Sequence, residues 1–137
     1  MGVTEATLQQ QVADYLRLQY PDVLFHSDFG SGIKLTMGQA VKQKRQNGGR
    51  RAWPDMFIAE PRPAKGYCGL FLELKREGTR LYKKDGTWAT PHIAEQAETI
   101  SKLNKNGYIA GFVCGFEEAK RVIDSYLKGT GVIVIAK

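Results

Sequence analysis

The sequence predicts a single α/β domain in which helices flank a mixed β-sheet. Segments with helical and with strand-like apolar spacing follow one another in the order helix, strand, strand, strand, helix, strand, helix. With 137 residues, 42% of them hydrophobic, the chain is long enough for one continuous core but too short for a separate recognition module. We therefore take residues 1–137 as one domain, with residues 128–137 as an extra strand or a tail.

The N-terminal segment predicts a helix that begins after Thr4, its N-cap, and ends at about Tyr20, before Pro21. Its apolar positions form one stripe at helical spacing: Leu8, Val12, Tyr15 and Leu16. Glu5 lies three residues before Leu8 on the same side of the helix. Two interpretations of Glu5 stay open: a surface residue that complements the helix dipole, or an acid that reaches into a functional site.

A first strand is expected over residues 23–27, followed by a loop over residues 28–32. His26 in this strand is either a hydrogen-bonded structural residue, or a general base or DNA contact. Thr36 then caps a short helix through residue 46, which the Asn47-Gly48-Gly49 turn ends.

This part of the chain carries a run of basic residues without any acid. The run consists of Lys34, Lys42, Lys44, Arg45, Arg50 and Arg51. The whole chain has a formal net charge of +6, and both features favour a polyanionic partner. The run is either a solvated surface or a surface that binds the phosphate backbone of a nucleic acid, which positions a duplex without reading its bases.

Two short apolar segments, residues 53–59 and 68–75, are predicted to be strands of a hairpin, because a turn rich in Pro and Gly separates them. Side chains alternate along a strand, so Glu73 and Lys75 project from the same face. If the first strand pairs in the matching register, Asp55 lies beside them.

Asp55, Glu73 and Lys75 predict a metal-dependent site. Two carboxylates at one point repel each other, and a sheet interior solvates neither of them unless a divalent cation neutralises their charge. Oxygen ligands favour Mg²⁺ or Mn²⁺, which activate water and polarise phosphate oxygens. Lys75 then either orients the attacking water or balances charge in the transition state. Each motif alone is common in ordinary strands and turns, so the prediction depends on their order on adjacent strands.

Residues 76–89 contain a turn signal, Lys83-Lys84-Asp85-Gly86, and are expected to form a hairpin-like excursion. The excursion carries two aromatic residues, Tyr82 and Trp88. They either stack on exposed bases or pack against the excursion itself.

The rest of the chain predicts two helices and a strand. Thr90 and Pro91 begin a helix that runs to about Asn106 and has Gln96 beside its buried stripe. The stripe consists of Ile93, Ala97, Ile100 and Leu103. A strand, an amphipathic helix and a short final strand or extended tail follow, over residues 108–114, 116–128 and 132–136. The last segment pairs either with its own sheet or with a second copy of the chain.

Two observations concern the cellular compartment. Cys68 and Cys114 lack the spacing and the partners of a zinc site, and we expect both to be buried, reduced strand residues. The N-terminus has no signal-peptide pattern, and no apolar stretch is long enough to span a bilayer. The sequence therefore predicts a cytoplasmic protein that does not contact membranes.

The ordered set of motifs resembles the VRR-NUC (virus-type replication-repair nuclease) family of the PD-(D/E)XK superfamily. The resemblance extends from Glu5 to about Lys128. It is carried by Glu5, Trp53-Pro54-Asp55, Leu72-Glu73-Leu74-Lys75, Gln96, Leu103 and Gly107. It implies a fold like that of type II restriction endonucleases. The family often has an Asn near the end of the first strand, where this chain has His26-Ser27-Asp28, and the excursion over residues 80–90 is longer than the family requires.

Roles for individual residues follow from this resemblance. Asp55 and Glu73 would bind Mg²⁺ or Mn²⁺ together with the carbonyl group of Leu74, and Lys75 would be the catalytic lysine. Glu5 would lie at the metal directly or through water. Gln96 would line the site and contact metal-bound water or phosphate.

The resemblance also implies an activity. Small members that consist of the catalytic domain resemble phage-encoded resolvases of branched DNA. We therefore expect a structure-selective DNA endonuclease that cuts Holliday junctions as a homodimer, since two active sites are needed to cut both strands of a junction. Two alternatives stay open: a sequence-specific restriction-type endonuclease, and a basic nucleic-acid-binding module without catalysis.

Overall fold

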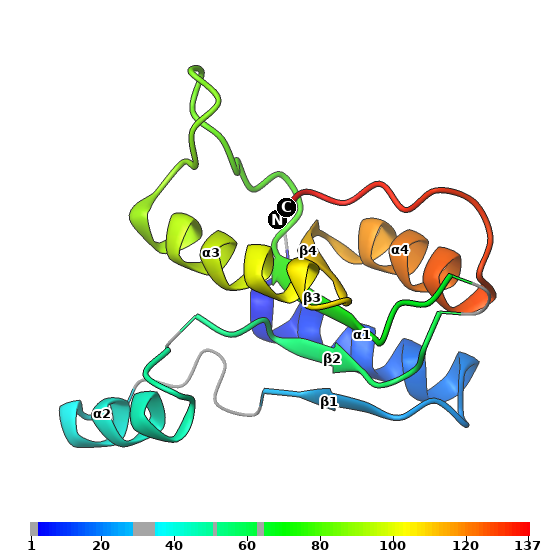
Figure 1. Ribbon diagram of the computed structural model, residues 1–137, viewed down its shortest axis with the longest axis horizontal. Coiled ribbons are helices and arrows are strands. Elements are labelled where there is room, and N and C mark those ends of the chain that lie inside the picture. Colours follow the sequence, from blue (N-terminus) through cyan, green and yellow to red (C-terminus); the bar gives the residue numbers. More distant parts are fainter. Residues whose placement is uncertain (1–2, 29–34, 51, 63–64) are drawn as a thin grey trace.

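The computed structural model describes residues 3–28, 35–50, 52–62 and 65–137 (Figure 1). Four helices and four strands occur in these residues. Their order is α1 (Glu5–Gln19), β1 (Phe25–Ser27), α2 (Met37–Gln46), β2 (Met56–Ile58), β3 (Leu70–Lys75), α3 (Pro91–Lys105), β4 (Ile109–Cys114) and α4 (Phe116–Lys128). The loop predicted over residues 28–32 lies outside the described residues except for Asp28.

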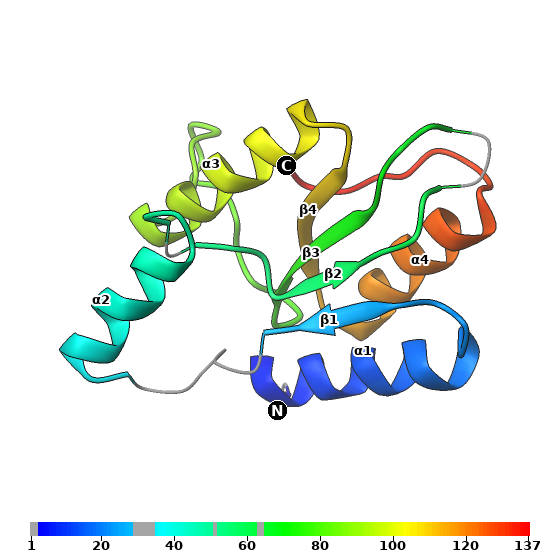
Figure 2. The ribbon, with the colours of Figure 1, turned by 60° about the horizontal axis from the view of Figure 1, so that its bottom comes forward.

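The four strands form one mixed sheet in the order β1-β2-β3-β4 (Figure 2). β2 pairs antiparallel with β1 and with β3, whereas β4 pairs parallel with β3. The antiparallel β2–β3 pair confirms the predicted hairpin, and the parallel pair is connected through α3, as a crossover between parallel strands requires. The predicted α/β fold with a mixed sheet is therefore confirmed.

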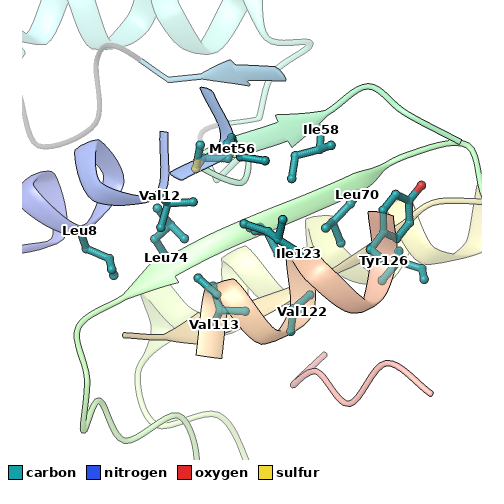
Figure 3. Close-up of a cluster of buried hydrophobic side chains, with 14 residues drawn as sticks. Leu8, Val12, Met56, Ile58, Leu70, Leu74, Val113, Val122, Ile123 and Tyr126 are labelled. Atoms are coloured by element: carbon teal, nitrogen blue, oxygen red, sulfur yellow. The ribbon is translucent and has the colours of Figure 1, made fainter. Parts of the chain in front are cut away.

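Helices cover the two faces of the sheet, α1 and α4 on one face and α3 on the other. β3 contributes Leu70, Leu72 and Leu74 to the core beneath α1 and α4 (Figure 3). Side chains alternate along a strand, so Phe71, Glu73 and Lys75 face α3. A second, smaller apolar cluster packs between α3 and this face of the sheet. The ionisable side chains of Glu73 and Lys75 thus lie on the same face as this cluster.

Both long helices adjacent to the site begin and pack as the sequence predicts. The Thr4 hydroxyl accepts a hydrogen bond from the Thr7 amide at 3.1 Å, so it caps α1, and three of its four predicted apolar positions are fully buried. The Thr90 hydroxyl caps α3 in the same way. All four residues of the predicted α3 stripe are buried.

Asn104 fixes α3 against β4. Its side-chain amide nitrogen donates to the carbonyl oxygen of Ala110, and its amide oxygen accepts from the Ala110 amide, both at 3.0 Å. Such a paired contact defines how far α3 is shifted along the strand. The position of every other residue on the buried stripe of α3 follows from it.

The excursion after β3 is a hairpin whose two aromatic residues pack against each other. Tyr82 and Trp88 face each other in an isolated β-bridge, and their rings stack at 4.7 Å between centroids. The Trp88 ring also lies 5.3 Å from the ring of Phe112 in the core beneath α3. Packing rather than base stacking therefore accounts for Trp88.

The C-terminal segment is an extended tail with one bridge to its own sheet. The Phe112 amide donates to the carbonyl oxygen of Ala136 at 2.8 Å. The close approach depends on Gly111, where a β-carbon would lie 2.6 Å from the Ala136 oxygen. The tail thus pairs within its own chain.

Two expectations are revised by the structure. Cys68 is exposed and precedes the first residue of β3, Leu70, by two positions. Cys114 is half-buried; neither cysteine is in a disulfide.

The predicted helix α2 does form, capped by Thr36, yet it buries none of its residues and extends away from the sheet (Figure 2). Among the described residues no helix has the length and apolarity to cross a bilayer.

Candidate active site

Asp55 and Glu73 lie opposite each other because of the β2–β3 register. Met56 pairs with Leu72, so the next antiparallel position pairs Asp55 with Glu73 and puts both side chains on the face of α3. Pro54 ends the regular ladder. The backbone amide of Leu74 instead donates to Oδ2 of Asp55 at 2.8 Å. The Asp55 carboxylate is thus fixed beside β3 by the same strand that carries Glu73.

Glu73 is only 3% exposed, and its electrostatic environment opposes ionisation. Burial raises the pKa of Glu73 well above its ordinary value, with further contributions from the carboxyl group of Asp55, which lies within hydrogen-bonding reach, and from the charge of Glu5. The positive charge of Lys75 lowers this pKa but does not compensate. The surroundings of Glu73 thus disfavour its charged form, and a cation bound beside it would offset this effect.

Lys75 follows Glu73 by two residues on the same face of β3 and is 6% exposed. Its register partner on β4 is Cys114, whose thiol has its pKa raised to about 11, mainly by burial and by Glu118. Lys75 acts on the ionisation of both Glu73 and Cys114. Its ammonium group therefore lies at the carboxyl end of β3, next to the acidic pair.

Glu5 lies near the acidic pair, at the exposed start of α1. Its charge acts on Glu73 and on Cys114, so it faces the same end of the sheet. Within the described parts of the chain, no three His, Cys, Asp or Glu side chains converge as a group able to hold a metal ion. The structure thus places Glu5 beside the Asp55–Glu73 pair rather than as a third member of it.

Gln96 is buried on α3, 6% exposed, and its Oε1 atom has no hydrogen-bond partner among the residues that the structure describes. It lies eight residues before Asn104, about 12 Å along the helix. Asn104 contacts Ala110, and four residues of strand from Ala110 to Cys114 span about 13 Å. Trp88, just before α3, packs on Phe112. The N-terminal half of α3 therefore lies toward the carboxyl end of β4, and its C-terminal end lies at Ala110. Gln96 therefore lies level with Glu73 and Lys75.

The oxygen atoms in this site fit a hard divalent cation. Asp55 and Glu73 supply two carboxylates at adjacent positions, and the buried amide oxygen of Gln96 accepts no hydrogen bond from the described parts of the chain. A buried acceptor without a partner is uncommon and usually marks a site for water or an ion. A cation would remove the repulsion between the carboxylates and provide water molecules for the Gln96 oxygen.

The basic residues separate into two groups. Lys42, Lys44 and Arg45 lie on α2, and none of the three is buried. Arg50 is instead bound within the chain: its Nη1 atom donates to the Thr99 hydroxyl at 3.0 Å and lies 3.8 Å from Glu98. Lys34 and Arg51 lie outside the described residues. The α2 group remains the candidate for backbone binding, while Arg50 attaches the segment after α2 to α3.

A hollow of about 300 Å³ adjoins the acidic pair on the side of β1. Asp55 forms part of its wall, together with His26 and Trp53. His26 is exposed on β1. Trp53 belongs to the Trp53-Pro54-Asp55 motif, but the motif alone assigns it no role of its own.

Comparisons with known proteins give one informative result. No family model and no curated protein matches the chain. Among solved structures, the chain is similar to one described as a "VRR_NUC domain protein", with 25% sequence identity and a TM-score of 0.66. The match covers 100% of this chain and 98% of that chain.

Proposed function

Because the chain belongs to the VRR-NUC family and is a nuclease-type domain, we propose that it is a Mg²⁺- or Mn²⁺-dependent endonuclease that hydrolyses phosphodiester bonds in branched DNA. One observation carries the proposal: Asp55, which precedes β2, lies beside Glu73 near the carboxyl end of β3, where Lys75 follows on the same face. A buried carboxyl group next to a half-buried one and a buried amine weakens the fold in the absence of a ligand and is typical of a functional site.

Asp55 and Glu73 would hold the cation, with the Leu74 carbonyl group as a further ligand and Glu5 acting through water. The bound cation would supply an activated water and stabilise charge on the phosphate. Lys75 would either orient the attacking water or stabilise with its positive charge the negative charge that develops on the phosphate oxygens. Gln96 would contact water bound to the cation, or the phosphate, through its side-chain amide.

Cutting a four-way junction symmetrically requires two active sites related by a two-fold axis. This chain supplies one acidic pair, so the proposal includes a homodimer in the active complex. Sedimentation of the protein alone and bound to a junction tests this part separately. A monomer on the junction would remove junction resolution from the proposal and leave single-strand cutting of branches.

The activity is tested with labelled DNA of four forms: linear duplex, flap, nicked duplex and four-way junction. Each is incubated with the protein and Mg²⁺, Mn²⁺ or EDTA. Metal-dependent cutting that favours the junction or flap supports the proposal. Cutting of linear duplex at one sequence indicates a restriction-type enzyme instead, and binding without cutting of any form indicates a binding module.

The basic surface of α2 makes a separate prediction. Replacing Lys42, Lys44 and Arg45 together by glutamine should weaken DNA binding about equally for all four forms. The slope of log affinity against log salt should become shallower by about 3, since each phosphate contact contributes about 0.9. Fluorescence anisotropy over a salt series measures both values.

A matched control uses three exposed basic residues on α3 and in the excursion: Lys83, Lys102 and Lys105. Their replacement by glutamine lowers the net charge equally. An equal loss of affinity in this control would show that net charge, rather than α2, attracts the DNA.

A further inference from the structure

We propose that the hollow beside Asp55 is a binding site for a single unpaired nucleobase, and that Trp53 is the residue on which this base stacks. The inference rests on the proposed function in one respect, because it assumes that DNA is the partner. It adds a site for the nucleotide next to the bond that is cut, and with it a physical reason for preferring branched DNA.

The hollow has the size and lining of a small-molecule site. Its volume of about 300 Å³ lies at the lower end of the range for ligand pockets, and its lining combines aromatic rings with a few polar groups. Trp53, Phe57 and Phe71 supply the rings. His26 and Asn47 border it with groups that form hydrogen bonds.

Trp53 is held in place although the core does not cover it. Its side chain is 41% exposed, while its Nε1 atom donates to the carbonyl oxygen of Asn47 at 3.3 Å. The ring packs against Phe71, 6.3 Å between centroids, and Phe71 in turn stacks on Phe57 at 4.4 Å. An exposed and already oriented indole loses little conformational entropy when a base stacks on it.

The lining decides between a base and a phosphate as the occupant. The rings of Trp53, Phe57 and Phe71 offer apolar faces but no positive charge for a phosphate. A nucleobase is planar and neutral, and it stacks on such rings. The phosphates instead find positive charge on α2, whose last turn carries Lys44 and Arg45 just before Asn47. A DNA strand whose phosphates contact α2 can therefore place one of its bases in the hollow.

The position of the hollow connects base binding to cutting. Asp55 is both a wall of the hollow and a member of the acidic pair, so the bound base belongs to a nucleotide next to the reacting phosphate. In a continuous duplex, that base must first be extruded from its stack, which costs free energy. At a branch point or bulge the base is already available. The hollow thus favours branched substrates without reading sequence.

The test measures base binding separately from cutting. Trp88→Phe leaves Trp53 as the only tryptophan, since the chain has two. This protein is titrated in Ca²⁺ with three duplexes that differ at one place: a bulged thymine, a bulged abasic site or no bulge. Trp53 emission and the anisotropy of labelled DNA are followed, and a gel verifies that the DNA stays intact.

We expect quenching of Trp53 emission by the thymine bulge but not by the abasic bulge. Adding Trp53→Ala should weaken binding to the thymine bulge about tenfold, the value of one base–aromatic stack, and leave the abasic bulge unchanged. Tyr82→Ala in the same background is the matched control, because Tyr82 is 40% exposed and lies in the excursion. It should change neither affinity.

Two results separate this inference from the proposed function. Equal affinity for the thymine and abasic bulges, or an equal loss for both in Trp53→Ala, would overturn the base site even if the protein cuts DNA in Mg²⁺. Base-dependent quenching in a protein that cuts none of the substrates would support the base site and overturn the nuclease.

Discussion

Replacement of Glu73 by glutamine is expected to stabilise the metal-free protein while abolishing both DNA cleavage and the response to Mg²⁺. Glutamine has nearly the same shape but carries no charge, so the repulsion from Asp55 and the cost of burying a carboxylate disappear. The free energy of unfolding should rise by about 1–3 kcal/mol, the range for relieving an uncompensated buried polar group. A neutral amide is a poor ligand, so cleavage should fall below detection.

The stability difference between Glu73→Gln and wild type should grow with pH. The folded state raises the pKa of Glu73 above its ordinary value of 4.5. Below pH 4.5 the group is protonated in both states and contributes no difference. As pH rises from there through the folded-state pKa, the folded state binds more protons than the unfolded state, so the wild type loses stability. Above the folded-state pKa the difference becomes constant.

Urea unfolding in EDTA at several pH values measures this difference, and repetition in Mg²⁺ measures the metal response. Mg²⁺ should stabilise the wild type increasingly as pH rises, because the cation binds the deprotonated carboxylate. Glu95→Gln, an exposed acid on α3, is the control and should behave as wild type. Equal stability of Glu73→Gln and wild type at all pH values would show that the acidic pair is not under strain.

The strands that carry the site were predictable because their signals are local. Alternation along residues 70–75 places Glu73 and Lys75 on one face, and the turn between the two strands makes their antiparallel pairing the simplest arrangement. Pro54 marks the end of the β2–β3 ladder. At Asp55 the side chain, rather than the backbone, therefore accepts the hydrogen bond from the Leu74 amide. The relative positions of Asp55, Glu73 and Lys75 thus follow from strand alternation, from the turn between the strands and from Pro54.

Other features depend on contacts between distant segments and left no local signal. Arg50 belongs to a basic run, yet the structure binds it to Thr99 and Glu98, which lie about fifty residues later. Helical spacing places Gln96 only beside the buried stripe of α3, and the expectation that it lines the site came from the family resemblance; its burial depends on how α3 packs against β4, where Asn104 contacts Ala110. Cys68 was expected inside a strand that in fact begins two residues later.

Replacement of Lys75 by methionine is expected to lower the rate of DNA cleavage by about 10²- to 10⁴-fold, the usual contribution of a positioned acid–base or charge-stabilising group. Methionine keeps most of the aliphatic stem, which matters because Lys75 is only 6% exposed and its stem packs in the sheet. DNA affinity and the cooperativity of unfolding should therefore stay close to wild type. Lys105→Met, at an exposed lysine on α3, should cleave normally.

If Lys75 has only a structural role, its replacement should leave the pH profile of metal binding unchanged. If it lies beside the acidic pair, its replacement should shift that profile. Lys75 lowers the pKa of Glu73, against burial, Asp55 and Glu5, which all raise it. Without the ammonium group the Glu73 pKa rises further, so the carboxylate that binds the cation forms only at higher pH. Calorimetric titration with Mn²⁺ should show the binding profile of Lys75→Met displaced to higher pH. Cleavage within about threefold of wild type together with an unmoved profile would separate Lys75 from the site and leave the hydrolysis without its proposed amine.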